Sequence, residues 1–237
     1  MTPILSYVLT GKTNEHITLD SRIGVPIHTR AIFPFLSLQK EAMKVGFDLR
    51  IASGFRDYDR QMLLWNEKAQ GKREILDYGG QRALDYGELT LNREDLLFAL
   101  LRWSSVPGAS RHHWGTEVDV YDYNAINSPT SEKLKLVPSE VEGGGPMASL
   151  HIWLDEMIDA KKAFGFFRPY EQDRGGVAME KWHLSYTPQS YLYDESYNYD
   201  FFIQTIEESD IELKDLILQN GKKIFNDYMK NICPYPN

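Results

Sequence analysis

Residues 115–123, GTEVDVYDY, constrain the fold more than any other stretch of the chain. Small or apolar residues at 116, 118 and 120 alternate with polar ones at 117, 119 and 121, which is the period-two pattern of a strand with one apolar face. Glu117 and Asp119 therefore share the other face. The sheet that holds this strand must bury one side and offer polar groups on the other.

Hydrophobic spacing predicts helices around 32–43, around 62–65 and at 93–103, with Asn92 as the N-cap of the last, and a strand in FDLRIAS, 47–53. Residues 124–148 are rich in turn formers and predict a long loop or insertion, after which Ser149 should cap a helix through LHIWLDEMIDAKKAF that stops at Gly165. Helices of unequal length separate the strands, without a regular βαβ alternation. The expected fold class is α+β, an antiparallel sheet flanked by helices.

The 237 residues suffice for one large domain or for a compact domain with an extension. We expect a domain over residues 1–187 and, over 188–237, a C-terminal helical extension packed on that domain, with a helix pattern in IELKDLILQNGKKIF.

Charge and cysteine content exclude several classes of function. A formal net charge of -8 opposes nonspecific attraction to nucleic acid, and the single Cys233 excludes both an internal disulfide framework and a cysteine-based zinc site. No apolar run approaches the roughly 20 residues of a membrane span, and the N-terminus has no export-signal pattern. Taken as written, the chain is expected to be cytoplasmic, or in the cell envelope if a leader is missing or export is non-standard. The sequence leaves the oligomeric state open.

Two short segments offer metal ligands. Alone, the histidine pair in SRHHWGTEVD, Ser110 to Asp119, fits an ordinary loop as well as a metal site, but MEKWHLSY adds an acid and another histidine. His112, Asp119 and His183 then provide two imidazoles and one carboxylate, the three protein ligands that a catalytic zinc takes while a fourth position stays open for water. Glu180 remains as a base.

The spacing within each segment requires bends. Residues three apart in a regular strand point to opposite faces, so Glu180 and His183 can converge only if the chain turns at Lys181, with a strand starting near Trp182. Gly115 is expected to provide the bend between the histidine loop and the strand that follows.

These segments resemble the zinc D-Ala-D-Ala peptidases related to VanX and VanY, which share a fold with the hedgehog signalling domain. The family pattern S-x-H-x-x-G-x-A-x-D, then E-x-W-H, is matched at Ser110, His112, Gly115, Asp119, Glu180, Trp182 and His183. Upstream, SGFRDYDRQ resembles the family's S-G-[YF]-R-[ST]-x-x-x-Q and contains Arg56 and Gln61. The resemblance covers about residues 53–186, the motif-bearing core.

The resemblance implies metal-assisted amide hydrolysis with one Zn²⁺ per chain, in agreement with the residue chemistry. Glu180 would act as the proton carrier, and Arg56 would hold a substrate carboxylate or the developing oxyanion. Gln61 would be a supporting polar residue among the substrate-binding groups, and Ser110 would orient substrate or His112. The site walls would be Trp182 and Trp114, and His113 would be structural.

Two positions depart from the family pattern. Glu117 stands where alanine is usual, so that a second carboxylate shares a strand face with Asp119; it could widen the polar site, pair with an arginine such as Arg111, or compete for the metal. Lys181 stands where proline is common.

The implied substrate is a peptidoglycan stem peptide or a small D-Ala-terminated peptide. D-alanyl-D-alanine carboxypeptidase activity is the leading expectation. An endolysin-like peptidoglycan endopeptidase and a D-Ala-D-Ala dipeptidase are the enzymatic alternatives, and a catalytically silent, zinc-stabilised binding module is the non-enzymatic one.

Overall fold

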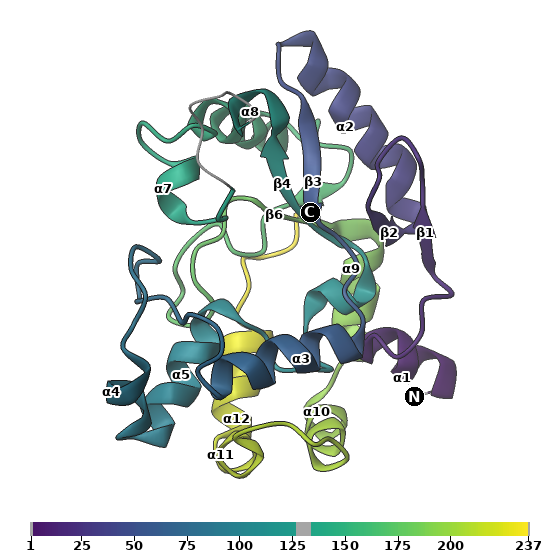
Figure 1. The fold of residues 1–237 in the computed structure, drawn as a ribbon. Helices are drawn as coiled ribbons and strands as arrows, with labels where there is room; N and C mark the ends of the chain where they lie inside the picture. The colour runs from purple at the N-terminus through teal and green to yellow at the C-terminus, as the bar shows by residue number, and fades with distance from the viewer. Residues whose placement is uncertain (1, 127–133, 237) are drawn as a thin grey trace.

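A four-stranded antiparallel sheet forms the centre of the computed structural model, which describes residues 2–126 and 134–236 (Figure 1). The strand order is β3-β4-β6-β5, with bounds β3 Leu49–Ser53, β4 Glu117–Asp122, β5 Phe166–Phe167 and β6 His183–Tyr186. Each neighbouring pair in the sheet is antiparallel. Helices flank this sheet, so the predicted α+β fold class is confirmed.

The register of β4 against β6 separates an apolar face from a polar one. Asp119 pairs with His183 and Glu117 with Ser185, so all four share one face. The intervening residues of both strands face the other way and are fully buried. They pack in one core with helices α2 (Ile32–Lys44) and α8 (Ala148–Asp159), which lie against the sheet in Figure 1.

A second core lies on the polar side of the sheet. It joins α1 (Pro3–Thr10), α3 (Tyr58–Ala69) and α5 (Arg93–Trp103) to the helices that follow β6. Those helices are α9 Thr187–Ser196, α10 Tyr199–Glu207, α11 Lys214–Gln219, α12 Gly221–Ile224 and the π-helical turn η3 Phe225–Met229. In Figure 1 most of these helices gather below the sheet.

Smaller elements complete the described chain. A two-stranded antiparallel sheet pairs β1 (Ile17–Leu19) with β2 (Pro26–His28). The remaining short helices are η1 Thr29–Ala31, α4 Tyr86–Thr90, η2 Arg111–Trp114, α6 Tyr123–Ile126 and α7 Pro138–Val141. Within the ranges given above, none of the helices has the length and apolar character to cross a membrane.

The helix expected to begin at Ser149 and run to residue 164 differs at both ends. α8 starts at Ala148, with Met147 as its N-cap residue, and it ends at Asp159. Lys161 adopts a left-handed backbone with φ 57, and the N–H of Lys162 donates to the carbonyl of Met157, which closes the helix in a Schellman-type turn. Glycine usually takes this position, but here it is a lysine, so the sequence did not indicate that the helix ends at Asp159.

The expected loop over 124–148 contains regular structure where it is described. Residues 123–126 form α6 and residues 138–141 form α7, and the remainder of that prediction, 127–133, lies outside the described residues.

Candidate metal centre

Hydrogen bonds join two segments that the sequence singled out, the loop after β3 and the histidine pair. The loop after β3 accepts a hydrogen bond from His112 Nδ1 at the Gly54 carbonyl, 2.8 Å away. The N–H of Arg56 donates to the His112 carbonyl at 3.1 Å, and His113 Nδ1 donates to the Arg56 carbonyl at 2.6 Å. Gly115, with φ 65, ends η2 and turns the chain into β4, as expected.

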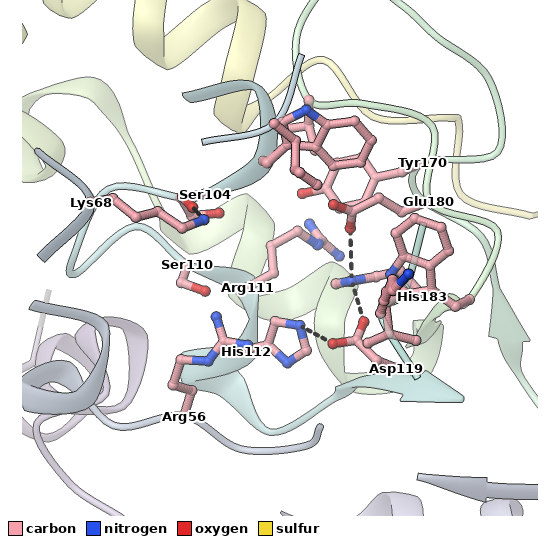
Figure 2. A pocket seen from close by; sticks show the side chains of 17 residues that line it. Arg56, Lys68, Ser104, Ser110, Arg111, His112, Asp119, Tyr170, Glu180 and His183 are labelled. Atoms are coloured by element: carbon pink, nitrogen blue, oxygen red, sulfur yellow. Dashed lines mark hydrogen bonds and ion pairs between the residues drawn. The ribbon is translucent and has the colours of Figure 1, made fainter. Parts of the chain in front are cut away.

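His112, Asp119 and His183 converge at this point (Figure 2). His112 Nε2 lies 3.3 Å from Asp119 Oδ2, and His183 Nδ1 lies 3.2 Å from Asp119 Oδ1. The three candidate ligand atoms all lie within 4.8 Å of one another, and all three residues are buried. The residues expected to bind metal are therefore brought together from η2, β4 and β6.

The donor atoms suit a metal ion. Because a carbonyl can only accept, His112 Nδ1 carries the proton and Nε2 keeps its lone pair toward Asp119. Asp119 Oδ1 and His183 Nδ1 face each other, yet neither completes a hydrogen bond within the described chain. Two ligands bound tetrahedrally to zinc at about 2.1 Å lie roughly 3.4 Å apart. The two histidine–aspartate separations, 3.3 and 3.2 Å, are close to this value, although they involve different oxygens of Asp119.

Glu180 lies at the edge of this cluster. Its Oε2 is 3.6 Å from His183 Nδ1, and its side chain is only 15% exposed. The expected turn at Lys181 is present, because the N–H of His183 donates to the Glu180 carbonyl, and β6 starts at His183, one residue later than expected. Burial raises the pKa of Glu180 to about 7, so that its carboxylate can exchange a proton near neutral pH.

Arg56 lines a cavity of about 230 Å³ together with the three candidate ligands and Glu180. Its guanidinium donates to Gln61 Oε1 at 2.9 Å and to Ser53 Oγ at 3.1 Å. Gln61 is 1% exposed, does not line the cavity, and donates its amide to the Ser105 carbonyl. Gln61 therefore supports Arg56 from behind, and the structure gives it no surface for a direct substrate contact.

Some of the other residues expected around the site line the cavity, and one does not. Ser110 and Trp182 line the cavity. Trp114 does not: its ring packs in the second core and its indole N–H donates to the Leu9 carbonyl. The expectation that Trp114 walls the cleft is wrong, because packing in the second core buries its ring there.

Lys68, Ser104 and Tyr170 also line the cavity and were not found from the sequence. Lys68 Nζ donates to Ser104 Oγ at 2.6 Å, and burial, with Arg56 nearby, lowers the pKa of Lys68 to about 8. Lys68 follows Gln61 by seven residues, two helical turns of α3, so it lies on the same helix face. The seven-residue spacing from Gln61 is the sequence feature from which Lys68 could have been predicted.

Glu117 is fully buried beneath the candidate metal ligands and does not line the cavity. Its Oε1 accepts from Arg111 Nη2 at 3.1 Å and from Ser185 Oγ at 2.8 Å, and its Oε2 lies 3.0 Å from His183 Nε2. Burial acts to raise the pKa of Glu117, but Arg111 and His183 outweigh it and lower the pKa to about 2. Among the three possibilities that the sequence left open, the structure contains the pairing with Arg111.

Several known proteins are similar to this chain in sequence or in structure. Two uncharacterised proteins of Haemophilus influenzae are similar in sequence: one is 38% identical over 107 residues, covering 42% of this chain and 68% of the relative, and the other is 32% identical over 126 residues, covering 52% and 92%. The solved structure of VanYB in complex with D-alanine-D-alanine aligns with a TM-score of 0.49 at 22% identity, covering 80% of this chain and 88% of that one.

A family model described as VanY, D-alanyl-D-alanine carboxypeptidase, matches residues 25–189, more than half of the chain, and that range contains each of the candidate ligands. The chain belongs to the VanY D-alanyl-D-alanine carboxypeptidase family.

Proposed function

We propose that this protein is a zinc-dependent D-alanyl-D-alanine carboxypeptidase that acts on peptidoglycan stem peptides, with one zinc per chain held by His112, Asp119 and His183. The observation that carries the proposal is the convergence of these three buried side chains beside Glu180, in a cavity that Arg56 also lines. Family membership agrees with this reaction.

Held by His112, Asp119 and His183, zinc would supply Lewis-acid activation of water and of the scissile carbonyl. Glu180 is placed to accept a proton from the attacking water, as the new C–O bond forms, and to deliver it to the amine nitrogen as the C–N bond breaks. Arg56, held by Gln61 and Ser53, can present its remaining N–H groups to negative charge in the cavity. Ser110 and Trp182 shape the walls that orient the peptide.

The charge on the cavity wall favours cleavage at the end of a peptide. Arg56 and Lys68 both line it, and Lys68 donates to the neutral hydroxyl of Ser104, so its positive charge is available to a substrate. Two cations beside a space of about 230 Å³ suit a terminal residue that carries a free carboxylate. An endopeptidase would instead have to pass a neutral peptide through this charged pocket.

The first test replaces the proton carrier. Glu180→Gln should retain zinc, because it leaves the three ligands intact, and should lose turnover of D-Ala-D-Ala-terminated peptides by at least about 100-fold, the usual contribution of a positioned acid–base group. Elemental analysis and mass spectrometry of digested muropeptides measure the two quantities. The matched control is Glu171→Gln, the same change at an exposed acid nearby. Unchanged turnover in Glu180→Gln would mean that the protein is not a hydrolase of this type, and absence of zinc in the wild type would refute the cofactor.

The second test separates terminal from internal cleavage. Amidating the C-terminus of the substrate removes the carboxylate, and for a carboxypeptidase kcat/KM should fall on the order of 10- to 100-fold, the value of a charge-assisted hydrogen bond. Lys68→Met should produce a similar loss on the free acid and little further loss on the amide. Equal rates on the acid and the amide would instead favour the endopeptidase.

A further inference from the structure

We propose that Glu117 is a positioning residue that orients His183 for metal binding, and that Arg111 holds the carboxylate of Glu117 in place. The inference rests on the proposed zinc site, because it says that two residues which are not ligands, Glu117 and Arg111, set the orientation of one ligand, His183. Glu117 does not line the cavity, so its effect on the site passes through His183, whereas Arg111 does line it.

Glu117 selects the orientation of the His183 ring. Its Oε1 accepts from Arg111 Nη2 and Ser185 Oγ, which leaves Oε2, 3.0 Å from His183 Nε2, to accept from the ring, so Nε2 carries a proton. The opposite ring nitrogen, Nδ1, then points to Asp119 Oδ1. Flipping the ring would place a carbon against the carboxylate of Glu117. The contact therefore selects both the orientation of the imidazole and the nitrogen available to a metal.

The sheet holds the carboxylate of Glu117 between two residues of β6. Glu117 and Asp119 are two residues apart on β4, and their partners on β6 are Ser185 and His183. Glu117 reaches His183 diagonally across the two strands, while Ser185 donates to its other oxygen. The carboxylate is thus fixed from both sides, with 0% of its side chain exposed.

A buried carboxylate needs a fixed counter-charge. Arg111, 5% exposed, provides it through Nη2, which donates to Glu117, to Ser185 Oγ and to the hydroxyl of Tyr235. Its guanidinium also lies over the ring of Trp114 at 4.6 Å. Arg111 therefore cannot leave Glu117 without abandoning several other contacts, and Figure 2 shows it beside His112 and His183.

A carboxylate that accepts the second N–H of a metal-bound histidine fixes its orientation and increases its basicity, and loss of such a partner typically weakens metal binding 10- to 100-fold. In Glu117→Gln the amide can rotate its NH₂ toward the imidazole, so the orientation is no longer enforced. We expect the dissociation constant for zinc, measured by competition with a chromophoric chelator, to rise 10- to 100-fold.

Two further variants separate positioning from simple neutralisation of Arg111. The double variant Glu117→Ala, Arg111→Met removes the charge pair together, so it stays testable even if Glu117→Gln folds poorly. If Glu117 positions His183, the double variant also binds zinc 10- to 100-fold more weakly; if Glu117 only neutralises Arg111, the double variant binds zinc as the wild type does, and the proposal is wrong. Asp173→Asn is the matched control, because it removes the carboxylate that pairs with another buried arginine, Arg102, away from the ligands. It should lower stability and leave zinc affinity intact.

A metal-independent measurement distinguishes failure of this inference from failure of the proposed function. The Nε2–H proton of His183, hydrogen-bonded to Glu117, should give a slowly exchanging downfield NMR resonance with and without zinc, and Glu117→Gln should shift it upfield or abolish it. If the wild type takes up no zinc, the proposed cofactor is wrong while this resonance still reports on the positioning contact. A His183 resonance that is the same in Glu117→Gln overturns the inference.

Discussion

At the scale of single residues, His112 and His113 are neighbours in the chain with opposite environments. His112 keeps one ring nitrogen facing Asp119, whereas both nitrogens of His113 are occupied by backbone groups: Nδ1 donates to the Arg56 carbonyl and Nε2 accepts from the N–H of Gly108. The expectation that His113 is structural agrees with this placement. Only the neutral form of His113 can make both bonds, and burial lowers its pKa to about 3.

His113 should therefore make the protein sensitive to acid. Its folded-state pKa lies below the unfolded value of 6.5, so its stabilising contribution is complete above pH 6.5 and is lost as the pH falls toward 3. Between pH 6 and 4 the free energy of unfolding of the wild type should fall by about 1.4 kcal/mol per pH unit more steeply than that of His113→Gln.

Denaturant unfolding of both proteins in chelator, at a series of pH values, measures this difference. The other buried histidines are present in both proteins, so their contributions cancel. Parallel pH dependences would show that His113 does not contribute.

Residue types and spacing were enough to predict the candidate ligands, because each is a strong metal donor within a short, ordered motif. Lys68 and Tyr235 could not be assigned in the same way. Lys68 reaches the cavity from α3, and Tyr235 reaches Arg111 across 124 residues of sequence, so their contacts depend on tertiary packing.

At the scale of elements, the short turn between η2 and β4 sets the separation of two candidate ligands. Gly115 has φ 65, and its carbonyl accepts from the N–H of His28 at 2.8 Å, which ties the turn to β2. A Cβ at this position would lie 2.3 Å from Ile17 Cδ1 and 2.9 Å from His28 N. The turn therefore needs glycine for both its backbone angle and its close approach to β1 and β2.

Gly115→Ala should destabilise the protein by more than the 1–2 kcal/mol that a left-handed alanine costs, because the backbone of β2 must also move. It should weaken zinc binding as well, since His112 and Asp119 flank the turn. Gly24→Ala is the matched control: Gly24 has φ 77, but a Cβ there meets nothing within 4 Å. Equal losses of unfolding free energy in the two variants would show that close packing at Gly115 has no role.

The elements themselves were predictable wherever apolar periodicity was long. The structure contains α2, α3, α5, β3 and β4 where the patterns placed them, and Asn92 caps α5 by accepting from the N–H of Glu94. The end of α8 was not predictable, because a left-handed lysine closes it, and that conformation has no compositional signature.

At the scale of the whole molecule, two cores lie on opposite sides of the central sheet, and the tail contributes to the second. Phe202, Ile217 and Ile224 share that core with Trp65 and Leu97. The Trp65 indole also donates to the Glu212 carbonyl at 3.0 Å. The division into a domain and a C-terminal extension stays a prediction, but the packing predicts how it would behave on unfolding.

The 237-residue chain should unfold in a single transition that tryptophan fluorescence and far-ultraviolet circular dichroism report together, because the tail and α3 bury the same apolar side chains. A chain shortened to residues 1–187 should lack a cooperative transition, since Trp65 and Leu97 would be exposed to water. Two separate transitions, or a stable shortened chain, would show that the tail is an independent unit.

Asp119 pairs with His183 across β4 and β6, and under the proposed ligation this pairing would link metal binding to the folding reaction. These residues are neighbours in space but far apart in sequence, and a slip of one residue would carry one of them to the opposite face of the sheet. Under the proposed ligation, a slipped pairing has two ligands on one side and the third on the other, so zinc stabilises the native alignment and discriminates against its competitors. The ion would then favour the correct strand register during folding, in addition to its part in the proposed reaction.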